Sequence, residues 1–188
     1  AFGQYWHRLV GSSRSYRGHA DAAVALDPIR VRLGLLFRAG GGDGAIRIVG
    51  TAATASGHRL NLKQALGLGT EMIERPTLDA SALRLPGSVD LFAQSKDNEA
   101  LYEWLAIWFA HAAPPQQDDD PLRNDLYFLR AALRTTRRTL TAWPGLRPVY
   151  DRLRRMTLSE RPRRNLPGVE GQIEAAIVHA LSGTVPAS

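Results

Sequence analysis

The stretch that decides the fold is residues 98–112, NEALYEWLAIWFAHA. Its apolar side chains recur at steps of three and four residues, which is the period of an α-helix. They cover so much of the helix circumference that we expect the rest of the domain to enclose this helix. Asp97 or Asn98 can cap its start, and Pro114 and Pro115 prevent its continuation. The apolar positions are Leu101, Trp104, Leu105, Ile107, Trp108, Phe109 and Ala112.

The segments after this helix repeat the helical pattern. Residues 114–120, PPQQDDD, predict an acidic loop, and Asp120-Pro121 is a typical helix start. From there a row of apolar residues predicts a buried face about six turns long, formed by Leu122, Leu126, Leu129, Leu133, Leu140 and Trp143. A parallel stripe follows one position over, formed by Arg123, Tyr127, Arg130, Arg134 and Arg137. Two further helices are predicted around a basic loop at 161–164, one with Val149, Leu153 and Met156 inward, the other with Val169, Ile173, Ala176, Ile177 and Leu181.

The segments before the central helix predict two helices and a small sheet. One helix is expected at 2–10, and another begins at Asp27-Pro28 and stops at the glycines 40–42. Alternating apolar residues at 46–54 and 60–62, with Ser56-Gly57 between them, predict two strands joined by a tight turn. Short apolar pieces at 83–85 and 89–92 are expected to form an edge strand at most. The fold class is therefore mainly α, a helical domain around a central buried helix with a small inserted antiparallel β element.

The whole chain fits one domain. It has 188 residues, of which 44% are hydrophobic and 22% charged, as in ordinary globular proteins. No apolar run is long enough to span a membrane, and no signal-peptide pattern is present. Cysteine is absent, which excludes disulfides, thiolate metal sites and thiol chemistry. We expect a cytoplasmic protein.

Arginine dominates the charge. The formal net charge is +6, and only Lys63 and Lys96 accompany the 22 arginines. Much of this reflects a composition typical of GC-rich genomes, but the distribution is uneven. Residues 123–164 contain twelve arginines and three acidic residues, an excess of +9. A partner with an anionic surface is the natural inference.

No pattern in the sequence indicates catalysis, a metal or a cofactor. The histidines at 7, 19, 58, 111 and 179 have no metal-ligand spacing, and no GxSxG or GK[ST] motif is present. His111 is interpreted as a structural or capping group. Residues 118–120, three aspartates, are interpreted as a solvated acidic loop. Asp79-Ala80-Ser81 begins like the DxSxS metal motif of von Willebrand A domains, but Leu83 replaces the final serine.

Five segments together resemble a known family. They are WHRLV at 6–10, LGLLFRAGGGDG at 33–44, RLPGSVDLF at 84–92, DNEALYEWLAIW at 97–108 and TAWPGLRPVYDRL at 141–153. Their order and spacing are similar to the N-terminal region of CbbO and NorD proteins, which accompany the MoxR-type AAA+ ATPases CbbQ and NorQ. The resemblance implies an adaptor domain spanning 1–188, without the C-terminal von Willebrand A domain of that family. It also implies docking on an ATPase hexamer that remodels rubisco, releasing inhibitory sugar phosphates (CbbO, which we favour from the sequence), or that activates nitric oxide reductase (NorD).

The arginine stripe has two interpretations. Arginine stems can simply cover the flanks of a buried leucine row while their charged ends stay in water. Alternatively, guanidinium groups one turn apart can meet a row of carboxylates. On the second interpretation the partner-binding residues are Arg130, Arg134, Arg137, Arg154 and Arg155, and the adaptor hypothesis ranks first. A nucleic-acid-binding module using the same basic third of the chain ranks second and an enzyme third.

Overall fold

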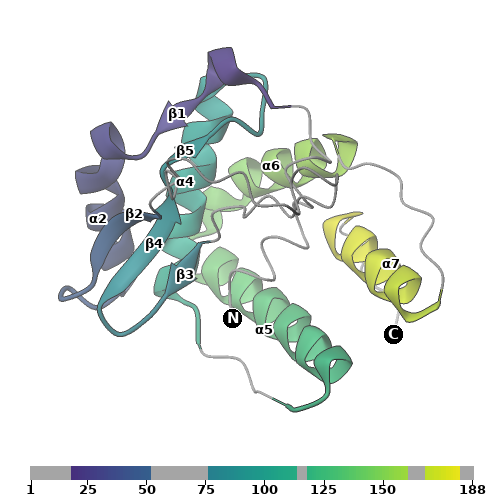
Figure 1. Ribbon diagram of the computed structural model, residues 1–188. Coiled ribbons are helices and arrows are strands. Elements are labelled where there is room, and N and C mark those ends of the chain that lie inside the picture. The colour runs from purple at the N-terminus through teal and green to yellow at the C-terminus, as the bar shows by residue number, and fades with distance from the viewer. Residues whose placement is uncertain (1–17, 52–75, 114–117, 161–167, 183–188) are drawn as a thin grey trace, which may run out of the picture.

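The computed structural model describes residues 18–51, 76–113, 118–160 and 168–182, and its helices dominate (Figure 1). The α-helices are α2 (Arg30–Ala39), α4 (Ser95–Ala110), α5 (Pro121–Ala142), α6 (Arg147–Glu160) and α7 (Gly168–Ser182). The strands are β1 (Val24–Ala25), β2 (Arg47–Thr51), β3 (Thr77–Leu78), β4 (Ala82–Pro86) and β5 (Ser88–Val89). Short 3-10 turns occupy Ala20–Ala22, Asp27–Ile29 and Pro144–Leu146. The predicted fold class, mainly α with a small β element, is confirmed. The β element is not purely antiparallel as expected, because β2 pairs with β4 in parallel.

Helix α4 is the centre of the core, as predicted. Nearly every side chain from Asp97 to Phe109 is buried, and the exceptions, Glu99 and Glu103, pair with Arg32 of α2. The predicted start was wrong: α4 begins at Ser95, after Gln94, whose side chain makes no capping hydrogen bond. Asp97 and Asn98 are therefore not caps but buried residues of the first turns. His111 is the C-cap residue, with its Nδ1 2.9 Å from the carbonyl oxygen of Ile107.

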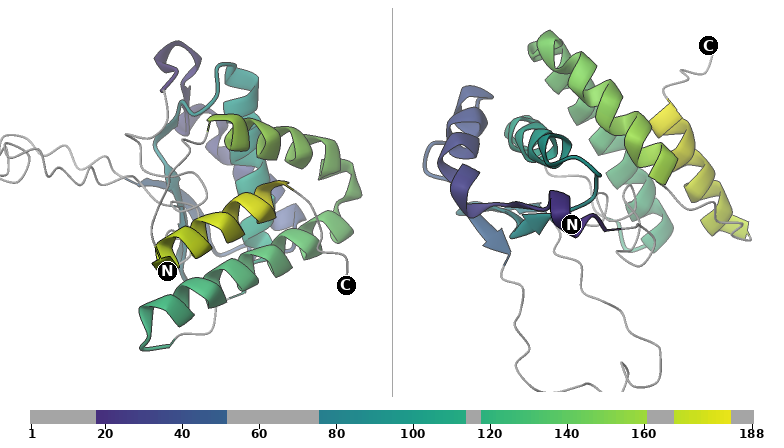
Figure 2. Two further views of the ribbon diagram at one scale, coloured as in Figure 1. Left: turned by 90° about the vertical axis from the view of Figure 1, so that its right-hand side faces the viewer. Right: turned by 90° about the horizontal axis from the view of Figure 1, so that it is seen from above.

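Helix α2 lies beside α4, on the same side of the larger sheet (Figure 2, right). The predicted Asp27-Pro28 start is confirmed, because these residues open the 3-10 turn that leads into α2. Leu33 and Phe37 turn inward and are buried. The helix ends at Gly40, and Gly42 lies against the ring of Phe37.

The larger sheet has the strand order β2-β4-β3. Strand β2 pairs with β4 in parallel, with Arg47 opposite Ala82 and Thr51 opposite Pro86, whereas β3 pairs with β4 antiparallel. The segment expected at the edge is thus the central strand, and Leu83 and Leu85 are fully buried. A second pair, β1 with β5, is antiparallel and joins the start of the described chain to the turn before α4.

Helix α6 packs against α4 through mixed contacts. Leu153 is buried in the core, and the rings of Trp104 and Tyr150 lie 4.8 Å apart. The Nε of Arg152 lies 3.0 Å from Asp97 Oδ1, whose side chain is 7% exposed. Helix α7 packs on the other side of α6, so that α5, α6 and α7 form the part of the molecule farthest from α2 (Figures 1 and 2).

Several predicted segments lie outside the described residues. They are the helix at 2–10, the second strand at 60–62, the first half of the acidic loop and the basic loop at 161–164. The tight turn at Ser56-Gly57 also lies there, so only the first strand of the predicted hairpin is observed, as β2. In the described part of the chain, no helix is long and apolar enough to cross a membrane.

Candidate partner-binding surface

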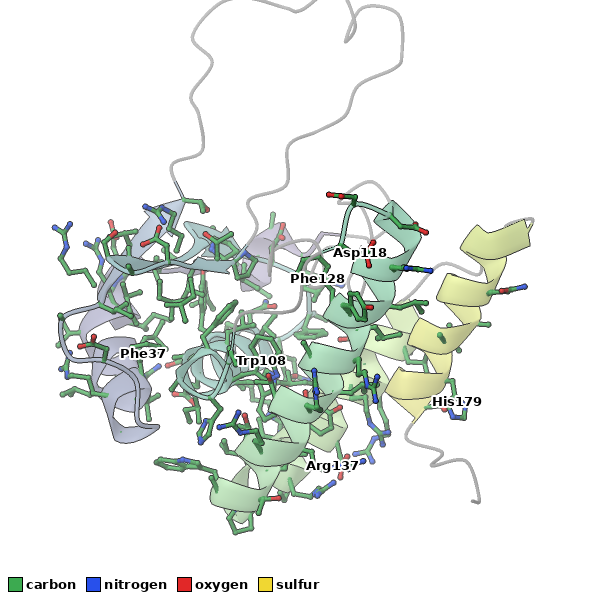
Figure 3. The ribbon with its side chains drawn as sticks, turned by 90° about the horizontal axis from the view of Figure 1, so that it is seen from below. Phe37, Trp108, Asp118, Phe128, Arg137 and His179 are labelled. Atoms are coloured by element: carbon green, nitrogen blue, oxygen red, sulfur yellow. The ribbon has the colours of Figure 1, made fainter. Side chains whose placement is uncertain are left out.

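Helix α5 packs on the core through two large apolar residues, Phe128 and Leu140, and otherwise through small and polar ones. The buried residues among its described side chains are Phe128, Ala131, Ala132, Thr135, Thr139 and Leu140. Trp108 of α4 donates its indole hydrogen bond to Thr136 Oγ1 at 3.0 Å, and Thr139 donates to the carbonyl oxygen of Thr135 at 2.9 Å. The Trp108–Thr136 hydrogen bond and the buried side chains fix the rotation of α5 about its axis. Figure 3 shows the resulting order across the molecule, from Phe37 of α2 through Trp108 of α4 to Arg137 of α5 and His179 of α7.

This rotation corrects the predicted buried face. Leu126 and Leu133 are 48% and 42% exposed, although the sequence pattern assigned them to the core. At 100° per residue they lie opposite Phe128 and Thr135, the middle of the buried face. The leucines instead share the solvent side of α5 with the arginine stripe. We call Leu126, Arg130, Leu133, Arg134 and Arg137 the outer face of α5.

The arginines of the outer face are exposed and unpaired. Among the side chains that the structure describes, no carboxylate forms an ion pair with Arg130, Arg134 or Arg137. Arg123, at the start of the helix, differs because Asp118 and Asp120 lie 3.8 and 3.9 Å from it. Unpaired guanidinium groups at one-turn spacing are free to pair with carboxylates from outside the chain.

The two remaining predicted residues, Arg154 and Arg155, lie on α6 and differ in exposure. Arg155 is exposed, but Arg154 has a side chain only 16% exposed, with Nη2 3.4 Å from Asp151 Oδ1. Its guanidinium carbon also lies 6.0 Å from the ring centroid of Tyr150. Burial raises the pKa of Tyr150, and the positive charge of Arg154 partly offsets that rise. Arg154 is thus occupied within the fold, whereas Arg155 is accessible on a helix other than α5.

The acidic motif at Asp79 has a structural role. Its Oδ1 accepts hydrogen bonds from the backbone amides of Ser81 and Ala82 and from the Ser81 hydroxyl, and Arg84 donates to Oδ2. These donors, Arg84 first, hold the pKa of Asp79 below its usual range. The carboxylate shapes the turn that begins β4. Among the residues that the structure describes, no three His, Cys, Asp or Glu side chains are grouped so that they could hold a metal ion.

A second exposed apolar pair escaped the sequence analysis. Val31 and Leu35 lie one turn apart on the outer side of α2, and Leu35 is 56% exposed. The helical period carries this signal, because the buried residues Leu33 and Phe37 leave Val31 and Leu35 on the opposite side of the helix.

Comparisons with known proteins give consistent relatives. The chain is 42% identical to the protein NorD of Brucella abortus (strain 2308) over 182 residues, and 31% identical to the protein NorD of Stutzerimonas stutzeri over 180 residues. An uncharacterised protein of Pseudomonas aeruginosa is 33% identical over 182 residues. Each match covers at least 95% of this chain, but the chain spans less than a third of the relatives' length, 29% of the Brucella protein and 28% of the other two. No family model and no solved structure matches the chain.

Proposed function

We propose, from its homology to the N-terminal portion of NorD proteins, that this chain is a non-catalytic adaptor domain that docks on a MoxR-type AAA+ ATPase hexamer of the NorQ kind. In this proposal the ATPase supplies the chemistry, and the assembled complex activates nitric oxide reductase in the cytoplasm. The adaptor connects the hexamer to its target.

The observation that supports docking is the outer face of α5. It presents three unpaired arginines and two half-exposed leucines on a helix whose opposite side is fixed to the core. Protein interfaces combine such apolar anchors with arginine, because a guanidinium pairs with carboxylates and its stem packs against apolar surface. We assign docking to Arg130, Arg134 and Arg137, with Arg155 of α6 as a peripheral contact.

The comparisons favour the NorD branch over the CbbO branch. The named relatives are NorD proteins from two genera, and none of the matches reported above is a CbbO protein. The role in rubisco remodelling that we favoured from the sequence has no support in these relatives. We therefore propose nitric oxide reductase activation as the process and keep the CbbQ complex as the comparison in the test.

Light scattering after size exclusion tests the proposal. This chain is mixed with NorQ and, separately, with CbbQ, each with ATP. We expect a discrete complex with NorQ that is lost in the triple variant Arg130→Glu, Arg134→Glu, Arg137→Glu. Absence of a complex with NorQ at low salt rejects the docking role, and a triple variant that still co-elutes rejects the assigned face.

Nucleic acid is the alternative partner for a basic surface. Phosphate contacts would give binding that weakens steeply with salt. The exposed leucines between the arginines argue against it, because phosphates gain nothing from an apolar neighbour. A shift of labelled DNA or RNA at low salt, without a complex with NorQ, would favour this alternative.

A further inference from the structure

The sequence of α5 contains a heptad repeat, and two of its three leucines are not buried by the part of the chain that the structure describes. Three successive heptads, starting at Arg123, Arg130 and Arg137, have arginine at the first position and leucine at the fourth. The leucines are Leu126, Leu133 and Leu140. First and fourth positions of a heptad stay on one side of a helix and form the contact line of coiled coils.

The repeat runs along the outer face, away from the core. Phe128, Ala131, Thr135 and Thr139 bury the opposite side, and the first two leucines stay 48% and 42% exposed. Leu140 is the exception, since it belongs to the hydrophobic core near the end of α5. The row of leucines is therefore buried at Leu140 and exposed at Leu133 and Leu126.

We propose that the outer face of α5 binds a single α-helix of its partner, one that has apolar side chains and carboxylates repeating every seven residues. The apolar side chains pack against Leu126 and Leu133, and the carboxylates pair with Arg130 and Arg137. This inference rests on the proposed function, because the helix is assigned to the ATPase. Binding of such a helix is more specific than a general attraction between charged surfaces, because the seven-residue repeat fixes the register of the two helices.

Charge selects the occupant of this face. A second copy of this chain would bring its own arginines against Arg130 and Arg137, and the outer face has no carboxylate to compensate. Polar residues at first heptad positions are known to specify which helix can pair. An acidic amphipathic helix satisfies both the charge and the apolar spacing.

Neighbouring arginines provide the matched test. Arg137 occupies the first heptad position, whereas Arg138 is also exposed but lies about 100° around the helix. Arg137→Glu and Arg138→Glu change the net charge by the same amount. Likewise Leu133→Ala is matched by Leu35→Ala on α2, which removes another exposed leucine, on the other side of the molecule.

The experiment measures the affinity of each variant for the NorQ hexamer with ATP, by biolayer interferometry at fixed salt. We expect Arg137→Glu and Leu133→Ala to weaken binding by about tenfold, as residues at the centre of an interface do, and both controls by less than about twofold. Circular dichroism and thermal unfolding should be unchanged in all four variants, since every substituted side chain is exposed.

The outcomes separate the inference from the proposed function. Equal losses for Arg137→Glu and Arg138→Glu, with Leu133→Ala neutral, overturn helix binding but leave docking intact. No binding by the unmodified chain overturns both. A concentration-dependent dimer of the chain alone that Leu133→Ala abolishes also overturns the inference, because the occupant is then a second copy.

Discussion

Asn98 connects three parts of the fold. Its Oδ1 accepts a hydrogen bond from the amide of Phe92 at 2.8 Å, and its Nδ2 donates to the carbonyl oxygens of Ala22 and Phe92 at 2.8 and 2.9 Å. The side chain is fully buried. It therefore satisfies backbone groups that water cannot reach and holds the segment before β1 to the start of α4.

Replacing Asn98 with Ala should lower the free energy of unfolding by about 3 kcal/mol, because three buried backbone groups lose their partners. Urea unfolding followed by circular dichroism measures the change. Gln94→Ala, four residues earlier and exposed, is the control and should shift the midpoint little. A loss for Asn98→Ala no larger than that of the control would show that water replaces the amide.

Asp79 makes stability depend on pH in the acid range. Its pKa in the fold lies below its ordinary value, chiefly because of Arg84, so its stabilisation is complete above the unfolded pKa of about 4. The stabilisation is lost as the pH falls through the lower folded pKa. We expect the unmodified chain to lose more stability between pH 5 and pH 2 than Asp79→Asn does, in urea titrations at each pH. High salt should shrink this difference because the pair is exposed.

The end of helix α2 depends on a close approach between Gly42 and the ring of Phe37. A Cβ at Gly42 would lie 2.3 Å from Cε1 of Phe37, whose ring is buried, so the ring has to move. Gly42→Ala should cost about 1–3 kcal/mol, the usual range for overpacking. Gly145→Ala, where no heavy atom lies within 4 Å of the added Cβ, is the matched control. Thermal unfolding of both variants measures the difference, and equal midpoints would contradict the prediction.

The elements could be predicted where the local signal was complete. The breadth of the apolar arc identified α4 as the central helix, and Asp27-Pro28 identified the start of the α2 region.

Two errors had physical causes. By hydrophobicity alone, Leu126 and Leu133 are better candidates for the buried face than an alanine or a threonine. The buried residues are instead Ala131, Thr135 and Thr139, which are small enough for α5 to approach α4 closely. The central position of β4 depends on its parallel pairing with β2, whose partner residues are 35 positions apart, and no local pattern shows such pairing.

The candidate partner-binding surface could be predicted in part from the sequence. Arg130, Arg134, Arg137 and Arg155 are exposed as expected, because an unpaired guanidinium is costly to bury. Arg154 could not be separated from Arg155 by sequence, since the difference arises from the contact with Asp151 and the ring of Tyr150. The contribution of the leucines to the surface was recognisable only after the rotation of α5 was known.

The charge of the whole molecule should govern how fast it finds its partner. Residues 123–164 have an excess of nine positive charges, enough to steer association with an acidic surface. We expect the association rate constant with NorQ to fall by about tenfold or more between 50 and 500 mM NaCl, while the dissociation rate constant changes less. Stopped-flow fluorescence of labelled chain measures both.

The arginines and the leucines of the outer face should affect different rate constants. Arg134→Glu, at the flank of the contact line, should mainly slow association and reduce its dependence on salt. Leu133→Ala should leave the association rate constant nearly unchanged and raise the dissociation rate constant, because its apolar contact forms only after docking. Kinetics at 50, 150 and 500 mM NaCl distinguish the two effects. If both variants changed only the dissociation rate constant, steering by the basic third of the chain would be wrong, and the arginines would act only as short-range contacts.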